Sequence, residues 1–245
     1  LGALRLVAFL PHPWLLAMGR AVGRLAERLA RRRRAIVDRN FELCFPQMSL
    51  DERRQLRRRH FESYGMGLMD VAIAWWWSTD RVMALSEVEG EEHLREAMSL
   101  GRGIILLTAH TSSLEISGRI LQTLLPIHAM YRPNENLVLE RFISTNRPKH
   151  IEGIIQRDNP RQMIKTLKQG GAVWYAPDQS YKGKGFVYAD FFGVPAATNP
   201  ATIVAQPLCA LARLENVPTC TSSSHQSPSR TSIIARPPSQ ASTGF

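Results

Sequence analysis

The chain has 245 residues, of which 44% are apolar and 21% charged, the profile of a folded globular protein with enough residues for one sizeable domain. Its formal charge of +10 attracts polyanions, so nucleic acid, anionic lipid and acidic carrier proteins are all compatible partners. The three cysteines show neither a disulfide framework nor metal-ligand spacing, which argues against a disulfide-rich secreted domain and indicates a reducing compartment.

The N-terminal region is predicted to be helical and amphipathic. Residues Trp14–Val37 are expected to form one helix, in which an apolar stripe lies opposite a basic face. The stripe contains Met18, Val22, Leu25, Leu29 and Ile36, and the basic face contains Arg20, Arg24, Arg28 and Arg31. Such a helix either packs its stripe on a protein core or lies on an anionic membrane, and the pattern alone does not decide between the two.

Two further helical stretches follow. Ser49 and Glu52 form a predicted capping box that opens a charged helix through about His60, and Phe61–Trp77 is a second, more apolar helical stretch. It ends in three adjacent tryptophans, which cannot all face one core. We therefore expect at least one of them at a protein or membrane interface.

The middle of the chain alternates strand and helix patterns. The apolar runs Gly103–Thr108, Ile127–Arg132 and Ala172–Tyr175 read as strands, the first of them as a buried parallel strand. Helical patterns lie between them, over Ser113–Leu125 and from Asp158-Asn159-Pro160 to Gly170-Gly171. This alternation predicts an α/β fold in which helices flank a sheet and ligands bind at the carboxyl ends of the strands.

The character of the sequence changes after about residue 198. Ser, Thr and Pro crowd Thr219–Phe245, where no periodic apolar pattern is found. We therefore predict three regions: a helical membrane-surface region over 1–80, an incomplete α/β domain over 81–198, and an atypical disordered tail over 199–245.

Polar residues follow each of the three predicted strands. His110 comes directly after the first strand, and Glu115 lies in the first turn of the following helix. A neutral histidine oriented by a carboxylate is a general base for a hydroxyl. Arg132 follows the second strand and Asp178 the third, and such strand ends converge on one edge of an α/β sheet. Taken singly, each residue could instead have a purely structural role, as a helix cap, a loop histidine, a surface arginine or part of a turn.

Together these stretches resemble a known family. The chain is similar to the late acyltransferases of lipid A biosynthesis, the lauroyl and myristoyl transferases that act on Kdo-lipid IVA. The resemblance rests on Asn40–Pro46, Phe61–Met69, His110-x4-Glu115, Tyr131-Arg132-Pro133-Asn134 and Val173–Asp178, and it covers roughly Leu4 to Thr198.

The resemblance implies direct acyl transfer from acyl carrier protein to a hydroxyl of a lipid A precursor. His110 would be the catalytic base and Glu115 its partner, while Arg132 and Asp178 would bind substrate at the active site. It implies no metal and no organic cofactor. It also implies a peripheral or singly anchored protein at the cytoplasmic face of the bacterial inner membrane, with an anionic membrane surface as partner.

Two other functional classes are compatible with parts of the sequence. A glycerolipid acyltransferase would use the same pair of residues, but that family typically has Asp at the position of Glu115. A non-enzymatic basic protein that binds membranes or nucleic acid would explain the charge. No nucleic-acid-binding motif accompanies that charge, so we expect no nucleic-acid partner. The unusual end of the chain suggests a reading-frame shift in the source gene.

Overall fold

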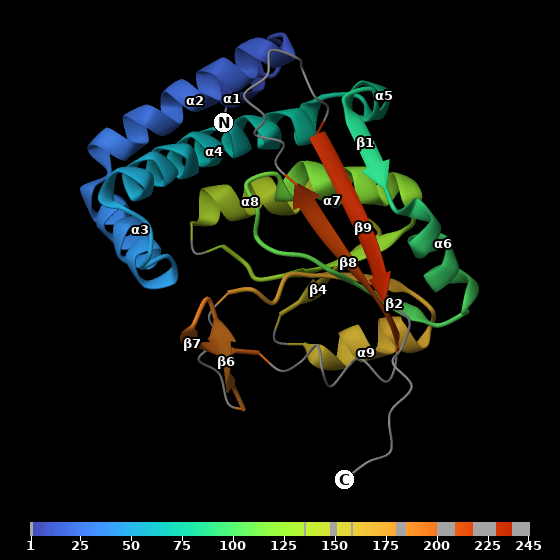
Figure 1. Cartoon of the computed structure of the whole chain (residues 1–245). Helices are drawn as coiled ribbons and strands as arrows, with labels where there is room; N and C mark the ends of the chain where they lie inside the picture. Colours follow the sequence, from blue (N-terminus) through green and yellow to red (C-terminus); the bar gives the residue numbers. More distant parts are fainter. Residues whose placement is uncertain are drawn as a thin grey trace. The chain divides into compact units, whose positions relative to one another are not determined.

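The computed structural model describes residues 2–134, 136–147, 151–157, 159–179, 185–199, 209–217 and 229–236 (Figure 1). The chain divides into two compact units. The first comprises Leu1–Trp77, Ser112–Ile116 and Ser180–Thr198, and the second comprises Ser78–Thr111, Ser117–Gln179 and Asn199–Phe245. The first boundary lies close to the expected one at residue 80, but the helical unit also takes two later segments that the sequence analysis assigned to the α/β domain.

Helices dominate the described part of the first unit. They are α1 (Gly2–Val7), α2 (His12–Leu29), α3 (Arg31–Cys44) and α4 (Leu50–Trp76). An antiparallel hairpin of β6 (Val187–Phe191) and β7 (Val194–Thr198) completes it. The hairpin tip packs on the end of α3, where the rings of Phe192 and Phe45 lie 5.2 Å apart.

The prediction of one helix over Trp14–Val37 is wrong, because the chain bends at Ala30. Ala30 leaves the helical region with φ −85° and ψ 65°, so α2 ends there and α3 begins. One side chain of α4 bridges the bend, since Arg57 donates to Glu27 of α2 and to Asp38 of α3, both at 2.8 Å. Alanine is the best helix former, so the bend follows from tertiary contacts that periodicity does not reveal.

Helix α4 begins as predicted but runs further than expected. The hydroxyl of Ser49 accepts a hydrogen bond from the backbone N–H of Glu52, whose carboxylate in turn accepts from the N–H of Ser49 at 2.7 Å. The capping box is thereby confirmed. The two helical stretches expected on either side of His60 form one continuous helix, because nothing between them breaks the backbone hydrogen bonds.

Glycines allow α2 and α4 to pack very closely along each other, as Figure 1 shows. A Cβ atom added to Gly23 of α2 would lie 2.1 Å from the carbonyl oxygen of Phe61 in α4. One added to Gly65 of α4 would lie 2.1 Å from the carbonyl oxygen of Gly19. The spacing Gly19-x-x-x-Gly23 therefore brings two backbones together, as in other close helix pairs with small residues at the contact.

In the described part of the second unit, seven strands form one sheet with the order β1-β9-β8-β2-β5-β3-β4. All neighbouring strands pair in parallel except β8 and β9, which are antiparallel. The strands are β1 (Ser86–Glu89), β2 (Gly103–Leu107), β3 (Ile127–Tyr131), β4 (Gly153–Gln156), β5 (Ala172–Tyr175), β8 (Cys209–Val217) and β9 (Ser229–Arg236).

Helices connect most of these strands, which confirms the predicted α/β class. The connecting helices are α6 (Glu91–Ser99), α7 (Leu114–Leu124), α8 (Leu137–Asn146) and α9 (Pro160–Lys168), and the short helix α5 (Thr79–Met83) precedes β1. The predicted start of α9 is confirmed at its cap, where the Asn159 side chain accepts from the backbone N–H of Gln162 at 3.1 Å. Asp158 lies outside the described residues.

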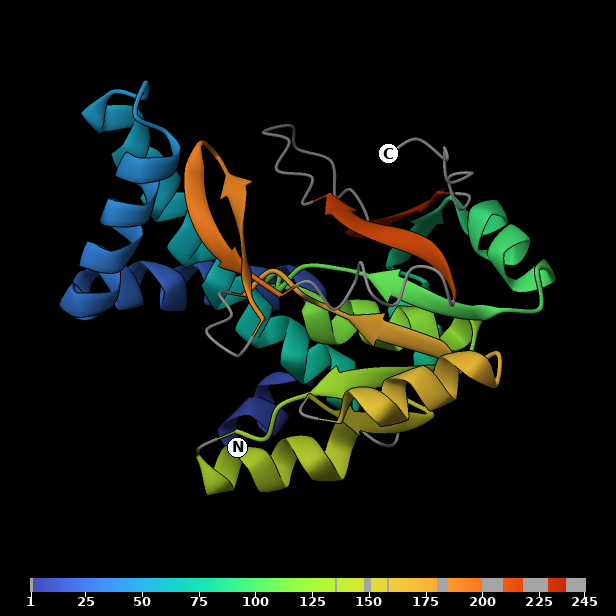
Figure 2. The same ribbon diagram turned by 90° about the horizontal axis from the view of Figure 1, so that it is seen from below.

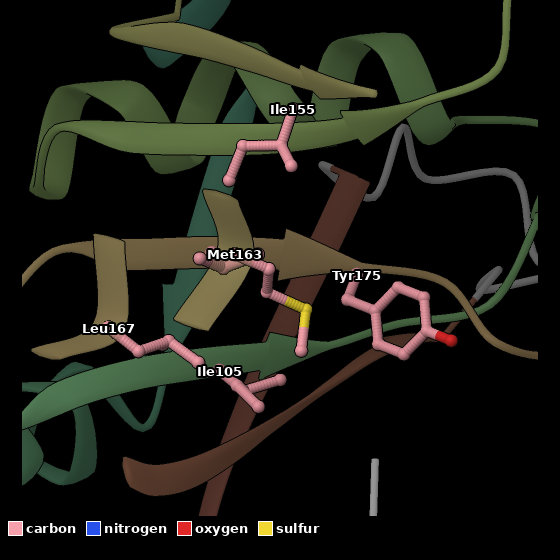
Figure 3. Packing of buried hydrophobic residues seen from close by; sticks show 6 residues of the cluster. Ile105, Ile155, Met163, Leu167 and Tyr175 are labelled. Atoms are coloured by element: carbon pink, nitrogen blue, oxygen red, sulfur yellow. The ribbon is translucent and has the colours of Figure 1, made fainter. Parts of the chain in front are cut away.

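Strand β5 is covered by helices on both faces. Val173 and Tyr175 point to one face, where they pack with Met163 and Leu167 of α9, and Ile105 and Ile155 from β2 and β4 complete this cluster (Figure 3). Trp174 points to the other face, toward α7. A Cβ atom added to Gly118 of α7 would lie 2.5 Å from its ring.

The predicted disordered tail differs from the structure over two segments. Cys209–Val217 and Ser229–Arg236 are strands of the sheet, and β8 pairs with the edge of β2 that β5 leaves open. The prediction rested on the Ser-, Thr- and Pro-rich composition and on the lack of a periodic apolar pattern. It neglected the backbone hydrogen bonds that an exposed strand edge offers to a segment beside it. The other residues after 199 lie outside the described part.

Candidate active site

The strand order brings three predicted site residues to one edge of the sheet. Strand β5 lies between β2 and β3 and is parallel to both (Figure 2). The segments that follow these strands therefore leave the sheet side by side. Those segments carry His110 after β2, Asp178 after β5 and Arg132 after β3.

His110 and Asp178 form a two-point contact. The Nδ1 atom of His110 lies 2.6 Å from Oδ1 of Asp178, and the backbone N–H of His110 donates to Oδ2 of Asp178 at 2.8 Å. An ionised carboxylate has no proton to donate, so Nδ1 of a neutral imidazole must carry the hydrogen. The lone pair is then on Nε2, the protonation state that a general base needs. The His110 side chain keeps 39% of its surface exposed, so the ring remains accessible to a substrate.

An open pocket at the same strand ends contains Arg132 beside His110. Its empty space is about 520 Å³, including the part open to solvent. The other lining residues are Met130, Tyr131, Arg157, Tyr175, Ala176, Pro177, Gln179 and Asn199. Two guanidinium groups and an imidazole thus border one pocket, which suits an anionic substrate or developing negative charge on an oxygen.

The side chain of Tyr175 belongs both to the core cluster and to the lining of the pocket. Its ring packs in the core, and its hydroxyl points away from the aliphatic side chains (Figure 3). The amide of Asn199 donates to that hydroxyl at 3.1 Å. The position of the pocket wall is therefore set by core packing.

Sequence reasoning missed Arg157 and Asn199 as pocket residues. Arg157 follows β4, a strand that the sequence analysis did not predict because only Ile154 and Ile155 mark it. The signal for Arg157 was present nonetheless, since a charged residue directly follows a short apolar run. Asn199 falls where the analysis placed the beginning of the tail.

The structure assigns His110 to the second unit and Glu115 to the first. Glu115 lies in the first turn of α7, and its carboxylate accepts a hydrogen bond from Nε1 of Trp75 in α4 at 3.3 Å. In the same unit, the hydroxyls of Ser63 and Ser112 lie 2.9 Å apart. The carboxylate that contacts His110 within its own unit is that of Asp178, and the role of Glu115 stays a prediction.

A partly buried contact between Tyr131 and Glu140 supports the loop that carries Arg132. Tyr131 donates its hydroxyl hydrogen to Oε2 of Glu140 in α8, and the backbone N–H of Asn134 donates to the same oxygen at 2.6 Å. Desolvation, together with this hydrogen bond, raises the pKa of Tyr131 to about 12. The guanidinium of Arg147 lies 5.0 Å from the centre of the Tyr131 ring.

No cluster of three metal-ligating side chains occurs among the described residues. The described side chains of the pocket supply a base and cations, which suits activation of a hydroxyl and stabilisation of an oxyanion. A helix-flanked parallel sheet with such a site at its strand ends is the layout of an α/β enzyme.

Comparison with known proteins identifies the class of enzyme. Residues 1–222 match the family described as bacterial lipid A biosynthesis acyltransferase. The chain is 40% identical to the lipid A biosynthesis lauroyltransferase of Escherichia coli (strain K12) over 203 residues, 82% of this chain and 66% of that protein. It is 39% identical to the lipid A biosynthesis palmitoleoyltransferase of the same strain over 215 residues, 87% of this chain and 70% of that protein.

A more distant relative is a lipid A biosynthesis acyltransferase of Haemophilus influenzae, 37% identical over 193 residues, 78% of this chain and 61% of that protein. The chain belongs to the bacterial lipid A biosynthesis acyltransferase family. It spans about two thirds of the length of the relatives it matches. The family match continues to residue 222, so the expectation that the resemblance ends near Thr198 is wrong.

Proposed function

We propose that this chain transfers a fatty acyl group from acyl carrier protein to a hydroxyl of a lipid A precursor, Kdo-lipid IVA. The observation that carries the proposal is the His110–Asp178 pair beside Arg132, in a chain of the lipid A acyltransferase family. The relatives are named for lauroyl and palmitoleoyl transfer.

The chemistry follows from the protonation state of His110. Its Nε2 removes the proton of the acceptor hydroxyl, and the oxygen attacks the thioester carbonyl. The C–S bond then breaks, and the departing thiolate takes the proton from the imidazolium. Asp178 holds the ring in the required tautomer and stabilises its protonated form. Arg132 either binds acceptor charge or stabilises the oxyanion.

Glu115 remains a proposed catalytic residue on the strength of its spacing from His110 and of the family resemblance. It belongs to a different unit, and its carboxylate already accepts the Trp75 indole hydrogen. Variants of Glu115 and Asp178 therefore separate the contributions of the two carboxylates.

We further propose that the protein works at the cytoplasmic face of the inner membrane. Among the described residues, no helix is long and apolar enough to cross a bilayer. Helix α2 buries Leu15, Gly19 and Gly23, while Leu25 and Leu29 of the apolar stripe are 54% and 72% exposed. These two residues thus do not pack on the core, and this supports contact with an anionic membrane.

Mass spectrometry of lipid products tests the reaction. The protein is incubated with Kdo-lipid IVA and acyl carrier protein loaded with mixed chain lengths. We expect one acyl chain to be added. Replacing His110 with Ala should lower the rate by about 10²–10⁴-fold. Wild-type turnover in a folded His110→Ala protein would refute the base assignment, and a lack of acylated lipid with the parent chain would refute the reaction.

A further inference from the structure

We propose that Glu140 is the positioning residue for Arg132, acting through the loop between β3 and α8. The inference rests on the proposed function, because it assumes that Arg132 works in the pocket. Glu140 is not a lining residue of that pocket, whereas Arg132 and Tyr131 are. Any effect of Glu140 on the reaction must therefore pass through the residues it holds.

The geometry shows how one carboxylate holds the chain on both sides of Arg132. Tyr131 is the last residue of β3, and its hydroxyl donates to Oε2 of Glu140. Asn134 lies past Arg132 in the loop, and its backbone N–H donates to the same oxygen at 2.6 Å. Arg132 is thus placed between two residues that are tied to one atom of Glu140.

Further contacts strengthen this arrangement on both sides. The side-chain oxygen of Asn134 accepts from the backbone N–H of Asn136 at 2.9 Å, which continues the bonded path toward α8. At the strand end, the backbone N–H of Arg157 donates to the carbonyl oxygen of Tyr131 at 2.8 Å. Tyr131 is only 9% exposed, so its ring and hydroxyl are fixed by packing as well as by hydrogen bonding.

The two contacts require an acceptor oxygen at position 140. An oxygen that accepts from both a phenol and a backbone amide needs two lone pairs, which a carboxylate supplies. The two hydrogen bonds hold the pKa of Glu140 below its ordinary value, with the Tyr131 bond the larger cause. A glutamine oxygen can accept the same two hydrogen bonds without the charge, whereas alanine removes both.

The first test measures the loop itself. Hydrogen exchange of the segment that contains the Asn134 amide should be slow in the parent chain and in Glu140→Gln, and faster in Glu140→Ala. Ser144→Ala is the matched control, because Ser144 lies on α8 and its hydroxyl donates to the Arg141 carbonyl within the same helix. Unchanged exchange in Glu140→Ala would overturn the proposal.

The second test is a double-mutant cycle on kcat/KM for acyl transfer. A misplacement of about 1 Å in a substrate-positioning group costs up to about 100-fold in rate, so Glu140→Ala should lose activity on that scale while Glu140→Gln retains most of it. In an Arg132→Ala background, Glu140→Ala should cause no further loss. A merely structural role would give additive losses and lower the melting temperature, and that result would overturn the proposal.

The controls separate failure of this inference from failure of the proposed function. If Arg132→Ala acylates at the parent rate, the role proposed for Arg132 fails. Only the inference about Glu140 fails if Arg132→Ala lowers kcat/KM but Glu140→Ala either leaves it unchanged or lowers it additively with Arg132→Ala. If the parent transfers no acyl group, the same cycle on the Kd for Kdo-lipid IVA in mixed micelles decides about Glu140, with non-additive losses as the expected result.

Discussion

Replacing Asp178 with Asn should reverse the tautomer of His110. Asparagine keeps the shape of the side chain, so its oxygen can still accept from the backbone N–H of His110, now 2.8 Å from Asp178. Its amide nitrogen would then donate to Nδ1 of His110, in place of the present 2.6 Å contact to the carboxylate. The ring hydrogen is thereby forced onto Nε2, and the base has no lone pair for the hydroxyl.

The expected loss is therefore that of the general base, about 10²–10⁴-fold in kcat/KM, or about 3–5 kcal/mol of transition-state stabilisation. Asp178→Ala removes both contacts but leaves the imidazole free to adopt either tautomer. We accordingly expect Asp178→Asn to be as slow as Asp178→Ala or slower, although Asn is the more conservative change.

Steady-state acyl transfer at fixed lipid and carrier concentrations measures this order. Glu96→Gln is the matched control, because Glu96 is an exposed carboxylate on α6 of the same unit. If folded Asp178→Asn keeps a rate within about threefold of the parent, a loss of under 1 kcal/mol, the tautomer argument is refuted. A rate for Asp178→Asn well above that for Asp178→Ala would refute the proposed reversal.

Three further predictions concern stability and the membrane. Gly23→Ala should lower the free energy of unfolding in urea by about 1–3 kcal/mol through overpacking against Phe61, whereas Gly2→Ala, with nothing within 4 Å, should not. Burial raises the pKa of Asp70 to about 7, so the folded state binds more protons than the unfolded state. The free energy of unfolding should therefore fall as pH rises through about 4 to 7. The same pH dependence of this free energy in the parent and in Asp70→Asn would contradict the argument. Joint Gln substitution of Arg20, Arg28 and Arg31 should weaken binding to anionic vesicles at low salt, measured by sedimentation, by about 1 kcal/mol per residue. Unchanged binding would contradict a membrane role. Arg24 is left intact because it bonds Glu62 at 2.6 Å.

Much of the second unit could be predicted from sequence because its central strands β2 and β5 are buried. Gly103–Leu107 and Ala172–Tyr175 are continuous apolar runs, and such runs are needed where helices cover both faces of a parallel sheet. The rule that ligands bind at carboxyl ends of strands then placed His110, Arg132 and Asp178 at one edge. The structure brings these three residues to that edge.

The pairing of His110 with Asp178 could not be predicted in the same way. It depends on β5 being inserted between β2 and β3, and strand order is set by long-range packing that leaves no local pattern. The motif His110-x4-Glu115 contains a carboxylate close to His110 in sequence, and it therefore predicted Glu115 as the partner of His110. The contact with Asp178 spans 68 residues of sequence.

The bend at Ala30 and the contacts of Glu140 were missed for a related reason. Ala30 has no helix-breaking side chain, and the Arg57 contacts that bridge the two neighbouring helices come from a distant part of the sequence. Glu140 reads in sequence as an ordinary acidic residue in the first turn of a helix, where acids are common. Its two partners, Tyr131 and Asn134, become visible only in three dimensions.

The relative position of the side chains in the candidate site depends on the core packing around β5. A slip of one residue would move the end of the strand by about 3.3 Å, more than the 2.6 Å that separates His110 from Asp178. The same slip would turn Trp174 toward α9 and Val173 toward α7, so a large ring would replace a small side chain on one face and the reverse would happen on the other. Both edges of β5 are also hydrogen-bonded, to β2 and to β3. The register of this strand is therefore fixed by its packing, and the position of Asp178 relative to His110 follows from it.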